Sequence, residues 1–306
     1  MHTLYEHELH DLGELYRATT SDLAIAQRDF PQHELARLLN QLVARVHPVI
    51  YQGEPAALRQ LKQFYMRDFP RLFREMWPFM LASALLFYGP AVLYYIAVLI
   101  EPSLAELFLG PVVIAYAKDG TQWWKDLNAA NQVGASTIMT HNLRISFLAF
   151  AAGMTFGLLT VYVLIVNGLA IGGVFAIMQT YGHAGELGEF VIGHGVLELN
   201  EIMMAGASGL MLGYAMLRPG LLSRGNAIAQ AAQKAVRLLL GSAPLLVIAG
   251  LIEGFISPSD TIPFAVKAAI GIGSGVLLYA YLLLAGRSPK AVPVISAQDS
   301  DQSHSP

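Results

Sequence analysis

Residues 145–181 read ISFLAFAAGMTFGLLTVYVLIVNGLAIGGVFAIMQTY, and they open a run of 73 residues, Ile145 to Leu217, without a lysine or an arginine. Of the 306 residues in the chain, 55% are hydrophobic and 13% are charged, and the mean hydropathy is +0.49. An average soluble domain carries about a quarter charged residues, so this chain has too little charge to cover a surface in water. The composition argues against a disordered protein, a coiled coil or an ordinary cytosolic enzyme, and it predicts an all-α polytopic membrane protein.

Charge and cysteine content narrow the class of function further. The net charge is −3 and the isoelectric point is near 6.3, which gives no sign of nucleic-acid binding. The chain has no cysteine, so disulfide frameworks, thiol chemistry and cysteine-ligated metals are excluded. The first 20 residues are polar and lack the apolar stretch that a signal peptide needs. We therefore expect the amino terminus to stay in the cytoplasm.

Residues 1–75 differ in composition from the remainder, because they hold 19 of the 41 charged residues. Apolar residues recur there at i, i+3 and i+4 in three stretches, which predicts three amphipathic helices in a cytoplasmic helical domain. The third stretch ends with Arg67, Arg71 and Arg74, just before the apolar region. We expect these three cations to contact lipid headgroups and to orient the chain in the membrane.

Six apolar stretches follow, and five of them are long enough to cross about 30 Å of hydrocarbon at roughly 1.5 Å per residue. The third stretch is short, and Asn167-Gly168 leaves only a tight turn between it and the second. These two stretches are therefore predicted to form an antiparallel hairpin. The six predicted spans are residues 76–100, 144–166, 168–181, 190–217, 236–257 and 263–285.

The distribution of cations predicts the orientation of these spans. The loop at residues 218–237 carries four cations, so the positive-inside rule places it in the cytoplasm. With a cytoplasmic amino terminus, this placement requires the short third stretch to cross the membrane. We therefore predict about six transmembrane helices and both termini in the cytoplasm. Residues 76–287 form the transmembrane bundle, 101–143 an interfacial or extracytoplasmic segment, and 288–306 a disordered tail.

Glycines are dense in the predicted spans, and several pairs lie four residues apart. Small residues at this spacing let helices approach closely in lipid, which is their ordinary role. The same small-residue stripes serve equally well for homodimerisation, and the sequence leaves both uses open. The positions assigned to turns and close packing are Asn167, Gly168, Gly172, Gly195, Gly209, Gly213 and Gly254.

Ionisable residues inside spans are costly, and they are the candidate functional residues of this chain. His194, Glu198 and Glu201 lie at i, i+4 and i+7, so they share one face of the fourth predicted span. Because successive spans alternate in direction, Glu253 of the fifth span and Lys267 of the sixth fall near the same outer end of the bundle. The remaining members of the predicted polar layer are Asn142, Arg144 and His183.

Three hypotheses account for this polar layer, and the sequence leaves all three open. In the first, the acids pair with the cations and the histidine of the layer and hold the bundle together. In the second, Glu198, Glu201 and His194 change protonation in a transporter, a channel or a proton relay. In the third, His194 and Glu198, with Glu253, ligate zinc or another divalent ion in an intramembrane metal-dependent hydrolase.

Several short motifs, in their order and spacing, resemble the stage II sporulation protein M family. In the amino-terminal part they include Asp22-Leu23-Ala24, Leu39-Asn40 and Phe69-Pro70-Arg71. The resemblance extends from about residue 12 to residue 287, with one departure at His141-Asn142, where the family has two asparagines. The motifs in the bundle are Asn167-Gly168 with Gly172, His194-Gly195-x-x-Glu198-Leu199, Pro219-Gly220 with Arg224, and Ile252-Glu253-Gly254-Phe255-Ile256-Ser257-Pro258.

This resemblance implies a multi-pass protein of the bacterial cytoplasmic (inner) membrane. The sporulation member of the family anchors a complex of peptidoglycan-degrading enzymes and is not itself known as a hydrolase. Other relatives occur beside MoxR-type ATPases. We therefore expect a non-enzymatic scaffold or regulatory subunit of an envelope-associated complex, with no cofactor. The expected partners are the lipid bilayer, other membrane or envelope proteins, a MoxR-type ATPase system and a second copy of the chain in a homodimer, and no nucleic acid.

Overall fold

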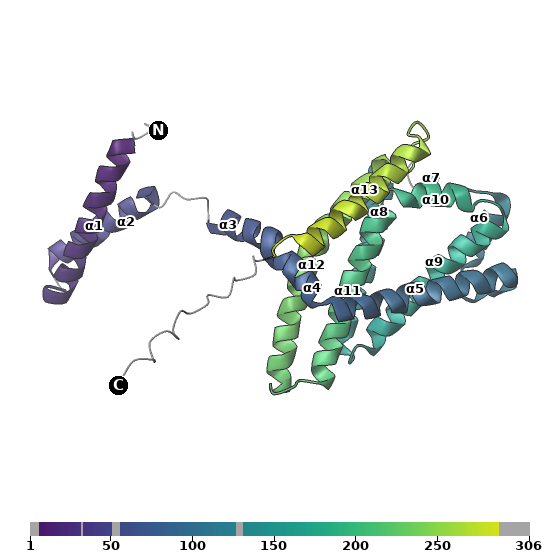
Figure 1. Cartoon of the computed structure of the whole chain (residues 1–306), viewed down its shortest axis with the longest axis horizontal. Helices are drawn as coiled ribbons and strands as arrows, with labels where there is room; N and C mark the ends of the chain where they lie inside the picture. Colours follow the sequence, from purple (N-terminus) through teal and green to yellow (C-terminus); the bar gives the residue numbers. More distant parts are fainter. Residues whose placement is uncertain (1–5, 32, 51–55, 127–130, 288–306) are drawn as a thin grey trace, which may run out of the picture. The chain divides into compact units, whose positions relative to one another are not determined.

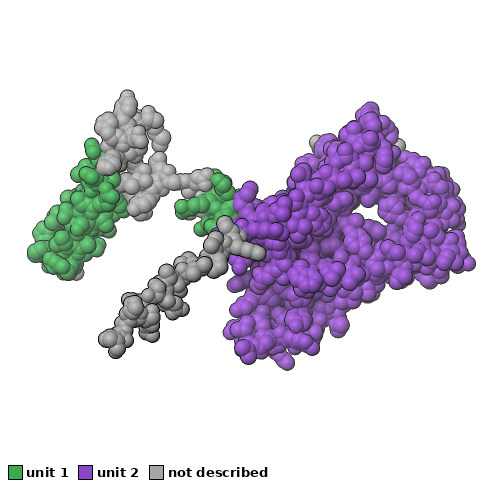
Figure 2. All heavy atoms as spheres, viewed as in Figure 1, with its two compact units in different colours: residues 1–64 green, residues 65–306 purple. Residues whose placement is uncertain are grey.

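The structure is a computed structural model that describes residues 6–31, 33–50, 56–126 and 131–287. Within these ranges the chain is all-α and contains no strand, as the composition predicts. The predicted tail at residues 288–306 lies outside the described residues. The chain divides into two compact units, residues 1–64 and 65–306, which Figure 2 colours green and purple.

The amino-terminal unit contains helices α1 (Glu6–Asp29), α2 (Glu34–Ile50) and α3 (Ala56–Gln63). The first two pack on one another, and the buried apolar side chains there are Leu23 and Ala26 of α1 and Ala36 of α2. The division between the units falls after Phe64, whereas the sequence predicted a domain boundary at residue 75. The boundary lies earlier because the short helix before residue 75 packs against the carboxy-terminal helices of the bundle.

Six helices of 21 to 32 residues build the described part of the second unit (Figure 1). Four of them, α5, α9, α12 and α13, are long and apolar enough to cross a membrane by length and composition. The elements are η1 (Phe64–Asp68), α4 (Phe69–Glu75), α5 (Trp77–Ile100), η2 (Pro102–Leu107), α6 (Pro111–Asp119), α7 (Trp123–Asp126), α8 (Asn131–Ala151), η3 (Ala152–Met154), α9 (Leu158–Thr180), α10 (Ala184–Ile192), α11 (Gly195–Leu217), α12 (Arg224–Phe255) and α13 (Phe264–Leu284).

The predicted turn at Asn167-Gly168 is wrong, because α9 runs unbroken through both residues. The side-chain amide of Asn167 donates a hydrogen bond to the carbonyl oxygen of Val163, 2.7 Å away in the same helix, so the asparagine does not end the helix. In place of the predicted spans 144–166 and 168–181, the structure has α8 and α9, and α9 is long enough to cross a membrane.

The chain turns between α8 and α9 instead, at residues 152–157. After η3, Phe156 adopts a φ of 57° and Gly157 a φ of 80°, both in the left-handed region. Two successive residues in this conformation reverse the chain between the two helices. A phenylalanine with a left-handed backbone is uncommon, so the pair Phe156-Gly157 is a weaker turn signal in the sequence than Asn-Gly is.

Helices α5 and α9 run side by side in the same direction (Figure 1). Gly168 faces the backbone of Phe87, and one turn later Gly172 faces the backbone of Ala91. A β-carbon at Gly172 would overlap the carbonyl oxygen of Ala91, so only glycine permits this approach. Gly172 is thus explained by the close approach of the α5 backbone.

Helix α11 is the central helix of the bundle. It packs against α5, α8, α9, α12 and α13, and most of its residues are buried. The backbone of Gly209 lies against Ala149 of α8, and Gly213 lies against Gly157 at the turn before α9. Helix α8 is the other long helix that does not qualify as an apolar span, and it packs against α11.

The contacts also give the direction in which each helix runs. Along α8 and α11, successive contacts advance together, from Asn142 with Glu198 to Ser146 with Glu201, so these two helices are parallel. Gly275 of α13 lies against Val196 of α11, and Tyr279 bonds to Asn200 further along, so α13 is parallel to α11 as well.

The segment after α5 is a packed cap at one end of the bundle. Trp124 is 1% exposed and shares a core with Leu109, Ala176 and Phe190, so the short elements from η2 to α7 pack against α9 and α10. The sequence predicted an interfacial segment up to residue 143, but α8 already begins at Asn131.

The approach of α5 to α9 yields a test of the fold. We expect Gly172→Ala to lower the free energy of unfolding by about 1–3 kcal/mol, because the added methyl group meets the Ala91 carbonyl. The control is Gly273→Ala in α13, where a β-carbon would meet no atom within 4 Å. Thermal unfolding of the full chain in detergent measures both, and equal midpoints for the two variants would contradict the packing.

Candidate functional site

The candidate site forms where the first turns of α11 meet the last turn of α12. His194 precedes α11 and is 3% exposed, and Glu253 of α12 is 1% exposed. The Nε2 atom of His194 lies 3.9 Å from Oε2 of Glu198 and 3.9 Å from Oε1 of Glu253. One imidazole edge thus faces two carboxyl groups from different helices, as the alternating span directions predict.

Helix α8 supplies hydrogen-bond donors to the acids of α11. The side-chain amide of Asn142 donates to Oε1 of Glu198, and the hydroxyl group of Ser146 donates to Oε2 of Glu201. Asn142, Ser146 and Glu201 are buried. Each pair joins α8 to α11 inside the bundle, so the acids contribute to holding these two helices together.

The second ring nitrogen of His194 is held by the end of α12. Nδ1 lies 2.8 Å from Oγ of Ser257, which is also buried. Gly193 makes room for this contact, since a β-carbon there would lie 3.2 Å from the same Oγ atom. The ring of Phe190 meets the imidazole edge to face at a centroid distance of 5.2 Å. The ring is therefore positioned from three sides.

One oxygen of the cluster has no hydrogen-bond partner among the described residues. It is Oε2 of Glu253, which is buried together with the remainder of its side chain. A buried polar atom without a partner is costly and calls for an explanation such as a bound proton or a water molecule.

Several predicted members of the polar layer lie elsewhere. Lys267 is buried near the site, but its ammonium group donates to Oε1 of Glu189, 2.8 Å away, so its partner is an acid of α10. The side chain of Arg144 is exposed. The ring of His183 is close to Gly120 of the cap. The structure thus brings together His194, Glu198, Glu253 and Asn142, with Glu201 one turn along α11.

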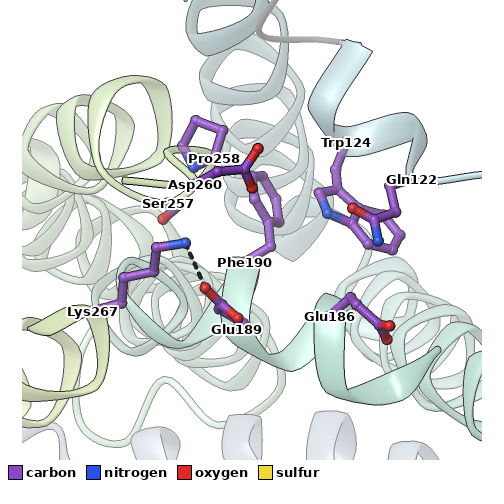
Figure 3. Close-up of a pocket in the computed structure, with 9 residues that line it drawn as sticks. All are labelled: Gln122, Trp124, Glu186, Glu189, Phe190, Ser257, Pro258, Asp260 and Lys267. Carbon is purple, nitrogen blue, oxygen red and sulfur yellow. Dashed lines mark hydrogen bonds and ion pairs between the residues drawn. The ribbon is translucent and has the colours of Figure 1, made fainter. Parts of the chain in front are cut away.

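A cavity of about 70 Å³ touches the site from the capped end of the bundle (Figure 3). Ser257 and Phe190, which hold the imidazole of His194, both line it. Glu189 and Lys267 form the ion pair drawn on its wall, and Trp124 closes the opposite side. The cavity is large enough for about two water molecules, at roughly 30 Å³ each.

The metal hypothesis gains no support from this geometry. Among the described residues, no group of three or more histidine, cysteine, aspartate or glutamate side chains is arranged to hold a metal ion. Asn142 engages Oε1 of Glu198 and Ser257 engages Nδ1 of His194. The remaining atoms, Oε2 of Glu198 and Nε2 of His194, face one another at 3.9 Å.

Comparison with known proteins bears on the family. Residues 79–258, more than half of the chain, match stage II sporulation protein M. The chain belongs to the stage II sporulation protein M family. Residues 2–52 match a separate domain of unknown function, DUF8413. The chain is also similar to an uncharacterized protein of Methanocaldococcus jannaschii, at 30% identity over 129 residues, which cover 42% of this chain and 72% of that protein. No solved structure matches.

The family match covers α5 to the end of α12 and therefore every residue of the His194 site. Ser146, Glu189 and Ser257 were not predicted as members of the site. Ser257 stands in the motif that ends in Ser257-Pro258, but a serine in such a motif is as compatible with helix termination as with binding. Ser146 gives no signal by itself, because its role depends on how α8 rotates against α11.

The pairing of α8 with α11 can be tested. We expect Ser146→Ala to lower the free energy of unfolding by about 1–3 kcal/mol, because it leaves Oε2 of Glu201 buried without a donor. Ser274→Ala is the control, since the hydroxyl group of Ser274 bonds only to the Gly271 carbonyl of its own helix, at 2.9 Å. Thermal unfolding in detergent measures both variants. A Ser146→Ala protein as stable as Ser274→Ala would show that the Glu201 contact contributes nothing.

Proposed function

We propose that this member of the stage II sporulation protein M family is a non-enzymatic, multi-pass membrane subunit that scaffolds or regulates an envelope-associated complex. Six helices would cross the membrane, and the amino-terminal unit would bind the partner proteins. The observation that carries this proposal is the exposed leucine face of α2.

That face is an apolar stripe on the surface of the amino-terminal unit. Leu35, Leu38 and Leu42 follow one another along one side of α2 and are 48%, 54% and 42% exposed. The hairpin with α1 buries Ala36, on a different side of the helix, and leaves these leucines open. An uncovered stripe of this kind is typical of a protein-binding surface.

Six crossings are supported by the directions of the helices. Helices α8, α11 and α13 are parallel to one another, and α5 is parallel to α9, as six alternating spans require. Helices α8 and α11 are too polar to be isolated spans, but their polar groups are paired inside the bundle. The cations of residues 218–237 support a cytoplasmic position of both termini, and the inner membrane is the location that we propose.

The buried polar site favours a fixed bundle over a catalytic centre. Asn142 and Ser146 tie α8 to α11, Ser257 ties α12 to the start of α11, and the hydroxyl group of Tyr279 in α13 bonds to Asn200 of α11 at 2.6 Å. Each of these links joins two helices, which is what a scaffold needs. This arrangement supports our proposal that the subunit has no enzymatic activity.

Site-specific photocrosslinking in native membranes tests the partner surface. We expect a crosslinker at position 38 to give a discrete product, because Leu38 lies on the exposed leucine face. The same crosslinker at position 37, on the polar side of α2, is the control. A product with the mass of two chains would assign the face to a homodimer, and a heavier or lighter one to another protein such as a MoxR-type ATPase. Equal patterns from both positions, or none, would contradict the proposal.

A transporter or channel is the second candidate, and the unpartnered Glu253 oxygen favours it. Such a protein would move protons or ions past His194 and Glu198. In reconstituted vesicles we then expect pH-dependent flux with the wild-type chain and little with Glu198→Gln, with Glu106→Gln as an exposed control outside the cavity. Equal flux for wild type and Glu198→Gln would exclude this function and leave the scaffold.

A further inference from the structure

The end of the bundle opposite the His194 site is held together by η1 and α4. The ring of Phe69 lies against Gly241 of α12, where a side chain would overlap it. The hydroxyl group of Tyr281 in α13 donates to the carbonyl oxygen of Tyr65. These contacts fix α4 against both carboxy-terminal helices.

A proline in α12 contributes to the same attachment. Pro244 lies inside the helix and has no N–H group, so it cannot donate to the carbonyl oxygen of Leu240 four residues earlier. The phenol of Tyr65 donates to that carbonyl oxygen instead, at 3.2 Å. The hydrogen bond that the proline removes from the helix is thus replaced by one from η1.

Three arginines lie on or next to this support. Arg71 and Arg74 lie one turn apart on α4, and Arg74 donates to the carbonyl oxygen of Leu282, in the last turn of α13. Helix α13 ends at Leu284, and Gly286, two residues later, has a φ of 66° and forms a turn against the backbone of Arg67. That turn directs the chain so that Arg287 comes near the two arginines of α4.

Arg287 and Arg71 each act electrostatically on Arg74. Its pKa is lowered from the ordinary arginine value, first by burial and then by the positive charges of Arg287 and Arg71. Like charges that lie this close repel one another unless an anion lies between them. We call Arg71, Arg74 and Arg287 the arginine cluster.

Neighbouring cations at the same end are neutralised, but the arginine cluster is not. Lys234 pairs with Glu75, and Arg237 pairs with Asp68 at 2.9 Å. Among the described residues, no carboxylate forms an ion pair with the arginine cluster. Within the part of the chain that the structure describes, the cluster therefore has no carboxylate as its counter-charge.

The arginine cluster also lies at the depth of lipid headgroups. Arg74 comes three residues before Trp77, where α5 begins, and Arg287 comes three residues after Leu284, where α13 ends. Both helices are candidate spans, and Trp77 is 62% exposed, as is typical of tryptophan at a membrane interface. An anion at this level is in reach of the cluster.

We propose that Arg71, Arg74 and Arg287 form a binding site for the phosphate group of an anionic phospholipid. Guanidinium groups bind phosphate oxygens in pairs of parallel hydrogen bonds, which a lysine cluster would not offer. Arg74 is fixed by its bond to α13, while the exposed Arg71 and Arg287 close on the phosphate from two sides. The bound lipid would then join α4 to the end of α13.

Native mass spectrometry of the full chain in neutral detergent tests this site. The protein is titrated with phosphatidylglycerol and, separately, with phosphatidylcholine. We expect phosphatidylglycerol to bind and phosphatidylcholine to bind much more weakly. The double variant Arg71→Gln/Arg287→Gln should bind phosphatidylglycerol roughly 30-fold more weakly, at about 1 kcal/mol for each cation removed.

The matched control is Arg218→Gln/Arg224→Gln, which removes two exposed cations at the turn between α11 and α12. It should bind phosphatidylglycerol within about twofold of the wild type, since it leaves the arginine cluster intact. An equal loss of phosphatidylglycerol affinity in the two double variants would mean that only net charge matters, and it would contradict the proposed site. Binding by Arg71→Gln/Arg287→Gln as tight as that of the wild type would contradict it too.

A separate arm distinguishes a lipid from free phosphate. Inorganic phosphate is added to the wild-type chain at the concentration of phosphatidylglycerol that half saturates it. We expect no displacement of the lipid, because the acyl chains keep its phosphate at the depth of the cluster. Full displacement would assign the cluster to a soluble phosphate and overturn the lipid proposal. Both arginines that are replaced are exposed, and the thermal midpoint of the double variant verifies its fold.

Discussion

The bundle depends on polar side chains of α8 and α11 that satisfy one another inside an otherwise apolar assembly. An unpaired carboxyl or amide group is costly in hydrocarbon, so neither helix is suited to cross a membrane alone. When the two helices pack together, Asn142 donates a hydrogen bond to Glu198, and Ser146 donates one to Glu201. The surrounding helices supply the apolar surface, and glycines such as Gly209 bring the backbones close enough for short side chains to meet. The other long helices run either parallel or antiparallel to α8 and α11.

Composition and periodicity predicted the helical class and most helix ends. The span predicted at 76–100 is α5, that at 263–285 is α13, and the carboxyl end of α11 falls at Leu217 as expected. The errors arose where a local signal competes with packing. Asn167-Gly168 has the sequence of a turn, yet its glycine lies within α9 because the backbone of Phe87 is close. A glycine required by a neighbouring helix cannot be distinguished, from sequence, from a glycine required by a turn.

The same limit applies to the His194 site. The spacing of His194, Glu198 and Glu201 on one helix face is periodic, so it was predictable, and the alternation of spans predicted that Glu253 would come near. Lys267 was placed at the correct end but with the wrong partner, because its distance to Glu189 depends on how α10 lies across the end of α13. Which side chains pair across two helices depends on how each helix is rotated about its own axis. No local pattern in a single sequence gives that rotation.

The proline of α12 has a consequence for how the two carboxy-terminal helices recognise η1. An uninterrupted helix presents a continuous ladder in which each interior carbonyl oxygen is already engaged. Pro244 leaves one acceptor open at a single height along the ladder, and Tyr65 occupies it. The free carbonyl oxygen thus favours one position of η1 along α12. A shift of η1 by one helical turn in either direction would lose the Tyr65 hydrogen bond. The absence of an N–H group at Pro244 therefore contributes to the alignment of η1 with α12.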